Sequence, residues 1–136
     1  MSQANPELQA LSQTMMEIEG RLEALHGELQ NLQILKEDVE MAISTIESIS
    51  TGATIQVPLG SETYIRASVA SEDDFIIGIG GGYSKVSNKE KVRSLLEERI
   101  ETLVDRMEKI SEAIDGLKTQ GEKLSQQAQE QLSKLQ

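Results

Sequence analysis

The sequence lacks cysteine and tryptophan, and aromatic residues make up only 2% of its 136 residues. The absence of cysteine excludes a disulfide scaffold, thiol catalysis and a cysteine-ligated zinc site. Large rings supply much of the buried area in ordinary protein cores, so their scarcity argues against a large compact core. The apolar residues are mainly Leu, Ile, Val, Met and Ala, a set that is typical of long helical seams.

Positive charge is also scarce. The chain has 13 Lys and Arg residues against 23 Asp and Glu residues, which gives a net charge of −10. This balance disfavours binding to nucleic acid and to anionic membrane surfaces, because both need clustered cations. No apolar run approaches the ~20 residues of a membrane span, and the N-terminus has no signal-peptide pattern. We therefore expect a cytoplasmic protein.

A heptad pattern of apolar residues fills the first third of the chain. Asn5 is a candidate N-cap, Pro6 fits the first helical position, and Glu7 complements the helix dipole. The apolar positions that follow at steps of three and four are Leu8, Leu11, Met15, Ile18, Leu22, Leu25, Leu29, Leu32, Val39, Ile43 and Ile46. Such a sustained pattern predicts a coiled-coil helix over residues 6–51, with Gly52 as its stop. Lys36 interrupts the seam, either as a register device or with its head reaching out to water.

A second heptad pattern fills the last third. The stretch SNKE at 87–90 predicts a capping box with Ser87 as the N-cap and Glu90 reaching back to it. The apolar seam then continues through Leu96, Ile100, Leu103, Met107, Ile110, Ile114, Leu117 and Leu124. We expect a helix over residues 88–135 that packs on the first helix, because neither apolar stripe is stable in water alone.

Residues 53–86 change to a period of two, with Gly and Pro between the runs. Residues that alternate onto one strand face are Ile55 and Val57, then Ile65, Ala67 and Val69, then Phe75, Ile77 and Ile79. The pattern predicts four short strands in two β-hairpins, with turns over residues 57–62 and 80–82. Isolated hairpins are marginally stable and leave edges exposed, so we expect them to associate with other subunits.

The predicted fold is therefore mainly α with a small β insert, in a single domain over residues 1–136. Two long helices form an antiparallel coiled coil, and two β-hairpins join their inner ends. The register that follows pairs Ile43 with Leu96, Val39 with Ile100, Leu32 with Met107, Leu25 with Ile114, Leu22 with Leu117 and Met15 with Leu124. It sets Ile18, Leu11 and Leu8 against the weak partners Gly121, Ala128 and Gln131, although a slip of one heptad is also possible. The seam is thus predicted to be under-filled at the free tips.

Four glycines lie in the outer halves of the predicted helices, at Gly20, Gly27, Gly116 and Gly121. Each costs about 1 kcal/mol relative to alanine in a helix interior. One interpretation is simple tolerance in a long solvated helix. The other is that they loosen the tips, so that apolar residues face something else; these are Leu8, Leu11, Met15, Met16, Leu132 and Leu135.

The arrangement of helix, two hairpins and helix resembles the α-type subunits of archaeal prefoldin. The most specific stretches are VPLGSETYIRASV and FIIGIGGGYSKVSNKEKV, which look like the two hairpins of that family. The resemblance implies an ATP-independent co-chaperone without a cofactor, a hetero-hexamer of two α-type and four β-type subunits. Its tips would hold unfolded client proteins and deliver them to a group II chaperonin.

The resemblance also assigns roles to residues. Client contact falls to the six tip residues Leu8, Leu11, Met15, Met16, Leu132 and Leu135. Subunit assembly falls to Ile55, Val57, Ile65, Val69, Phe75, Ile77 and Ile79. Because the C-terminal segment SQQAQEQLSKLQ is quite polar, we expect client capture by this chain either to rest more on the N-terminal tip or to be weak relative to that of the β-type subunits. An alternative function is a structural coiled-coil adaptor whose tips dock one folded partner.

The stretch GIGGG raises the possibility of a nucleotide site, because glycine loops before helices bind phosphate. However, Tyr83 stands where G-x-G-x-x-G needs its third glycine, and no parallel βαβ unit surrounds it. We interpret it as a tight hairpin turn at Gly80–Gly82.

The other candidate sites in the sequence are weak. His26 is alone and flanked by acids, and SEDD at 71–74 lacks the spaced oxygens of a calcium loop. No catalytic triad or Walker pattern is present. We therefore expect no metal site and no enzyme activity.

Overall fold

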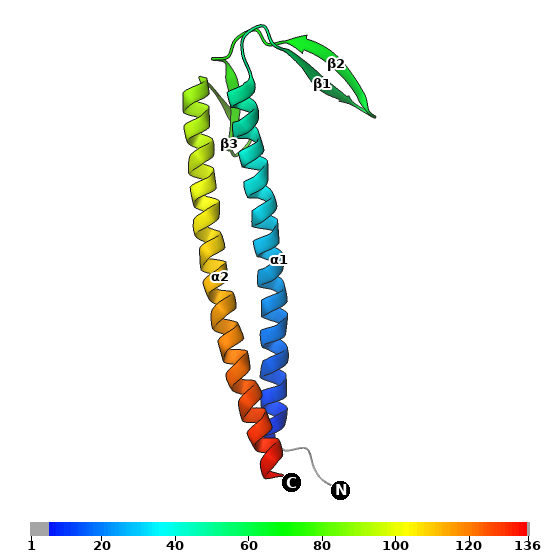
Figure 1. Cartoon of the computed structure of the whole chain (residues 1–136), viewed down its shortest axis with the longest axis vertical. Helices are drawn as coiled ribbons and strands as arrows, with labels where there is room; N and C mark the ends of the chain where they lie inside the picture. Colours follow the sequence, from blue (N-terminus) through cyan, green and yellow to red (C-terminus); the bar gives the residue numbers. More distant parts are fainter. Residues whose placement is uncertain (1–5, 136) are drawn as a thin grey trace. The chain divides into compact units, whose positions relative to one another are not determined.

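The computed structural model describes residues 6–135 and contains two long helices with two β-hairpins between them (Figure 1). The elements in chain order are α1 (Pro6–Ser48), β1 (Thr54–Gly60), β2 (Thr63–Ser68), β3 (Phe75–Gly80), β4 (Tyr83–Ser87) and α2 (Lys89–Lys134). The predicted fold class is confirmed. The chain forms two compact units, which we call the two-helix unit (residues 6–35 with 103–135) and the hairpin unit (residues 36–102).

The two-helix unit has its core along the predicted seam. Buried Leu32, Ile110 and Ile114 form its centre, and the half-buried residues packed against them are Leu22, Leu25, Leu29, Leu103 and Met107. Arg106 of α2 donates from Nε and Nη2 to Glu28 Oε1 of α1, at 3.1 and 2.6 Å. A methyl carbon placed on Gly121 would lie 3.8 Å from Cγ2 of Ile18. The helix segments in this unit are therefore antiparallel, and the predicted pairing of Ile18 with Gly121 is confirmed.

The hairpin unit has a separate core, to which the second hairpin contributes. Ile77 of β3 is buried with Ile46 of α1 and with Val92 and Leu96 of α2. The partly buried residues packed around them are Val39, Ala42, Ile43, Phe75 and Leu95. Arg99 also donates a hydrogen bond from Nη2 to the carbonyl of Gly78, which fixes β3 to α2. The second hairpin is thus part of the core of its own chain.

Both hairpins are antiparallel and share one local design. The two registers correspond with an offset of 20 residues. Val57 pairs with Ile65 in the first hairpin, and Ile77 pairs with Lys85 in the second. Each first strand carries a β-bulge just before its last glycine, between Pro58 and Gly60 and between Gly78 and Gly80. Each turn then has two residues with positive φ, which is the geometry of a tight type I′ hairpin turn. These residues are Ser61 (47°) and Glu62 (60°) in one hairpin, and Gly81 (61°) and Gly82 (80°) in the other.

Two predicted helix boundaries are wrong. The N-cap of α2 is Asn88, not Ser87, because Asn88 Oδ1 accepts the Lys91 N–H at 2.9 Å and the Asn88 carbonyl accepts the Val92 N–H. Ser87 instead pairs with Phe75 as the last residue of β4. The first helix ends at Ser48, before the predicted stop at Gly52.

Gly52 has a different role in the structure. Its φ is 84°, and its N–H donates to the Val69 carbonyl at 2.8 Å, so it turns the chain at the base of the first hairpin. The proposed cap Asn5 lies outside the described residues. Lys36 pairs with Glu40 at 3.1 Å, which brings its charged head out of the seam. Among residues 6–135, no helix has the length and hydropathy of a membrane span.

Candidate functional site

The six predicted tip residues differ in their exposure. Leu8, Leu11 and Met15 are half-buried along the α1 seam. Met16 lies off that seam and is 68% exposed. On α2, Leu132 and Leu135 are also exposed. The structure therefore divides the predicted tip residues between a partly covered seam and separate exposed side chains.

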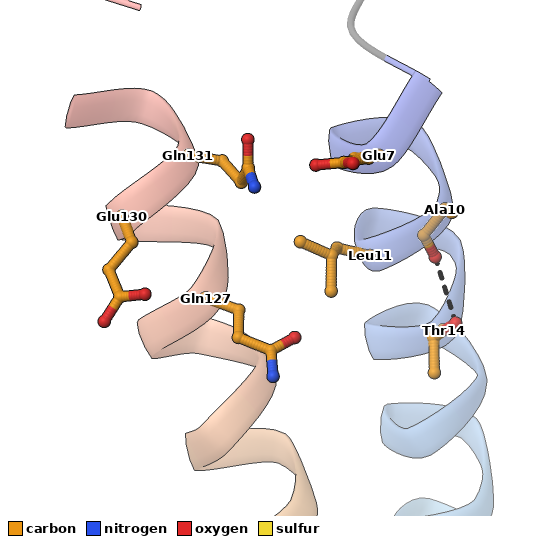
Figure 2. Close-up of a pocket in the computed structure, with 7 residues that line it drawn as sticks. All are labelled: Glu7, Ala10, Leu11, Thr14, Gln127, Glu130 and Gln131. Atoms are coloured by element: carbon orange, nitrogen blue, oxygen red, sulfur yellow. Dashed lines mark hydrogen bonds between the residues drawn. The ribbon is translucent and has the colours of Figure 1, made fainter. Parts of the chain in front are cut away.

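A groove lies between the helix ends of the two-helix unit, and we call it the tip groove. It has a volume of about 340 Å³, and its lining residues are Glu7, Ala10, Leu11, Thr14, Gln127, Glu130 and Gln131. Figure 2 shows Leu11 projecting from α1 toward α2, where the amides of Gln127 and Gln131 stand. The α1 wall thus has an apolar part at Ala10 and Leu11 between the polar residues Glu7 and Thr14. The α2 wall has the two amides and the carboxylate of Glu130.

The sequence explains why the groove stays open. After Leu124, the half-buried positions of α2 are occupied by small or polar residues, including Ser125, Ala128 and Gln131. On the α1 side, Thr14 Oγ1 donates to its own helix at the Ala10 carbonyl, at 3.0 Å (Figure 2). Leu11 therefore has no large apolar residue opposite it in the lining.

A second cavity of about 310 Å³ lies one to two turns further along the seam. Its lining includes Met15, Ile18, Leu22, Leu117 and Gly121. The glycine explains the space, because Ile18 meets no side chain at that position. The two cavities lie where the sequence predicts an under-filled seam, although Ile18 and Leu117 beside the second cavity are buried.

The charges in the lining of the tip groove are of one sign. Its lining contains the carboxylates of Glu7 and Glu130 and no Lys or Arg. Residues 6–20 add Glu17 and Glu19 and again contain no cation. The groove thus combines an apolar surface, amide hydrogen-bonding groups and negative charge, a combination suited to binding a segment of polypeptide.

The predicted assembly residues fall into two groups. Ile55, Ile65 and Ile79 are exposed, at 37%, 54% and 56%, and Val57 and Val69 are half-buried. Phe75 and Ile77 instead pack against the helices of their own chain, as part of the core of the hairpin unit. The apolar residues of the first hairpin are therefore more accessible to a partner subunit than Phe75 and Ile77, which face the helices of their own chain.

Sequence reasoning missed several exposed apolar residues of the hairpins. Ile76 and Val86 are cross-strand partners, and they are 75% and 63% exposed. Leu59, Tyr64 and Tyr83 are exposed as well. The signal was present in the run FII, because a strand with consecutive apolar residues has apolar side chains on both faces.

The other residues weighed in the sequence have plain structural roles. Gly80–Gly82 form the predicted hairpin turn. In the connection before β3, Ser71 Oγ accepts the Asp73 N–H at 3.1 Å, and Glu72 pairs with Lys89 at 3.4 Å. Lys89 also donates to the Ile49 carbonyl at 2.8 Å, an anchor that sequence reasoning missed. No group of three candidate metal ligands occurs among the described residues, and His26 is exposed.

Comparison with known proteins identifies the family. Residues 18–134 match the protein family described as prefoldin subunit. The chain belongs to the prefoldin family. It is similar to prefoldin subunit alpha of Haloarcula marismortui, with 40% identity over 75 residues, which is 55% of this chain and 49% of the relative. It is also similar to prefoldin subunit alpha of Pyrococcus horikoshii, with 23% identity over 96% of this chain and 90% of that relative.

The chain spans about half the length of the haloarchaeal prefoldin relatives that it matches. Two solved prefoldin structures share its fold. One is the filamentous PFD from Methanocaldococcus jannaschii, with a TM-score of 0.73 and 22% identity over 83% of this chain and 96% of that one. The other is the prefoldin beta subunit from Thermococcus strain KS-1, with a TM-score of 0.68 and 20% identity over 97% of each chain.

Proposed function

We propose that this prefoldin subunit is part of an ATP-independent co-chaperone that captures non-native polypeptides at its helix tips. The observation that supports the proposal is the tip groove, where Leu11 faces amides across an under-filled seam instead of an apolar partner. Unfolded chains expose both apolar side chains and unpaired backbone groups. A groove that presents both an apolar surface and amide groups can bind both kinds of group.

In this proposal the hairpins assemble the complex. The chain is the α-type subunit of a cytoplasmic hetero-hexamer with two α-type and four β-type subunits, which delivers its client to a group II chaperonin. The exposed residues Ile55, Ile65, Ile76 and Ile79 support assembly, because small two-stranded sheets with uncovered apolar faces are stabilised by further packing. The similarity to subunits named alpha supports the α-type role.

The test uses the full chain together with a β-type prefoldin subunit. Native mass spectrometry is expected to give a complex of two copies of this chain with four β-type subunits. That complex is expected to suppress the aggregation of several unrelated unfolded proteins, measured by light scattering without ATP. Unchanged aggregation at every client concentration would reject the chaperone role. Binding to a single folded protein, with none to unfolded chains, would favour the structural adaptor instead.

A further inference from the structure

We infer that the tip groove prefers unfolded segments in which an apolar residue is flanked by lysine or arginine. This inference rests on the proposed capture of non-native chains and specifies the chemistry of the captured segment. It concerns the tip groove alone, whose lining comes from the first turns of α1 and the last turns of α2.

The tip groove offers a bound segment both an apolar surface and amide groups. Leu11 and Ala10 offer an apolar surface that fits one side chain of moderate size. Opposite them, Gln127 and Gln131 each carry an amide that donates and accepts hydrogen bonds. An extended segment can place an apolar side chain on Leu11 while its backbone N–H and C=O groups bond to the glutamines. A bound segment therefore needs only one apolar side chain, placed on Leu11, to occupy the apolar part of the groove.

The lining of the tip groove also carries only negative charge. Glu7 lies in the lining on α1, with its carboxylate toward α2, and Glu130 lies in the lining on α2 (Figure 2). The two cations of the α2 tip, Lys123 and Lys134, are not lining residues. A basic residue next to the apolar anchor is therefore attracted to the groove, and an acidic residue at the same place is repelled. The net charge of −10 adds a longer-range attraction of the same sign.

The experiment compares two fluorescent peptides that are unstructured in water. Both carry the same central leucine and alanine residues; one is flanked by lysines and the other by an equal number of glutamates. Binding to the full chain is measured by fluorescence anisotropy at low and at high NaCl. We expect the lysine peptide to bind about tenfold more tightly at low salt, since each exposed charge pair contributes modestly. The difference should largely disappear near 1 M salt, where screening acts within about 3 Å.

Two variants separate the groove from the overall charge. Glu130→Gln removes a carboxylate from the lining and should reduce the preference for the lysine peptide by about twofold to fourfold. Glu112→Gln makes the same change of charge at an exposed α2 position outside the lining, and it should leave the preference nearly unchanged. An equal loss in both variants would overturn the assignment to the groove, because it would trace the preference to net charge.

The remaining outcomes distinguish this inference from the proposed function. Equal binding of the two peptides would overturn the charge preference while supporting capture of unfolded chains. If neither peptide binds although the assembled complex suppresses aggregation, the groove of this chain is not the capture site and the inference is wrong. If neither peptide binds and aggregation is also unchanged, the proposed function itself fails.

Discussion

At the residue scale, the start of α2 shows how a strand can override a capping pattern. Ser87 and Asn88 are both good N-cap residues, and the sequence SNKE favours the serine because a glutamate follows three residues later. The backbone of Ser87, however, is paired with Phe75 in the second hairpin. The cap therefore moves one residue on, to Asn88, a shift that local spacing cannot reveal.

Replacement of Asn88 tests this cap. Asn88→Ala removes the side-chain acceptor for the Lys91 N–H, so it should lower the free energy of unfolding by about 1 kcal/mol. Asn88→Asp keeps an acceptor in the same place and should retain most of the stability. Urea unfolding followed by circular dichroism measures both variants. The assignment would be contradicted if the aspartate variant lost as much stability as the alanine variant.

The two hairpin turns allow a second test at the residue scale. Ser61 and Glu62 hold positive φ values that glycine holds in the second hairpin, at a cost of roughly 1–2 kcal/mol for each non-glycine residue. The double change Ser61→Asn and Glu62→Gly introduces the residues that type I′ turns prefer. Amide hydrogen exchange at Val57 and Ile65, which pair across the first hairpin, should slow by about tenfold if roughly 1.4 kcal/mol is gained.

The matched control reverses the change in the second hairpin. Gly81→Ser together with Gly82→Glu places side chains at φ values of 61° and 80°. Exchange of the Ile77 and Lys85 amides, the cross-strand pair that corresponds to Val57 and Ile65, should then become faster. If the two double variants shifted exchange in the same direction, turn strain would not be what separates the hairpins.

At the scale of the elements, the seams of both helices were predictable and the packing of the second hairpin was not. Heptad spacing identified Ile18, Leu32, Ile46, Leu96, Ile110, Ile114 and Leu117, all of which are buried. It missed Val92, which is only 3% exposed. Val92 owes this burial partly to Ile77 of β3, which packs in the same core. Val92 lies four residues before Leu96 and so fits the helical period, but no periodic pattern shows which strand residue packs against it.

The glycines of the helices lead to a prediction at this scale. At Gly20, Gly27 and Gly116 an added Cβ would meet nothing within 4 Å, and at Gly121 it would meet Ile18 at an ordinary contact distance. Close packing therefore requires none of these glycines. Each Gly→Ala change should raise helix stability by about 1 kcal/mol, measured by thermal unfolding. Gly82→Ala, at a φ of 80° in a hairpin turn, should be destabilising and serves as the control.

The variant with all four alanines also decides between the two interpretations of these glycines. If the glycines are merely tolerated, the more stable chain will bind unfolded peptides as the original does. If they loosen the tips, peptide binding will weaken although the helices have become more stable. Binding and melting temperature measured on the same protein separate these outcomes.

At the scale of the whole molecule, sequence reasoning predicted which segments are apolar but not which faces remain uncovered. Phe75, Ile77 and Ile79 were grouped on one face by strict alternation. The structure places Ile77 in the core, while Ile79, at the bulge, is 56% exposed. A bulge adds one residue to a strand and disturbs the alternation after it. The sequence predicted weak seam partners at the tip. It did not predict that Gln127 and Gln131 line a groove with Leu11, because that depends on how the side chains of the two helices are placed around Leu11.

Neighbouring residues of β3 provide the sharpest test of how the chain divides its apolar residues between folding and assembly. Ile77 is 4% exposed and lies in the core, so Ile77→Ala should cost about 2–5 kcal/mol of stability in the chain alone. Ile76 is 75% exposed, and Ile76→Asp should leave the unfolding of the isolated chain nearly unchanged.

In a complex, however, a charge buried at a hairpin interface is strongly unfavourable, so Ile76→Asp should abolish the hexamer in native mass spectrometry. A hexamer that persisted at full yield with Ile76→Asp would show that this face is not an assembly surface. Lys85→Gln, at an exposed position of the same hairpin, makes the same one-unit change of net charge and is the control.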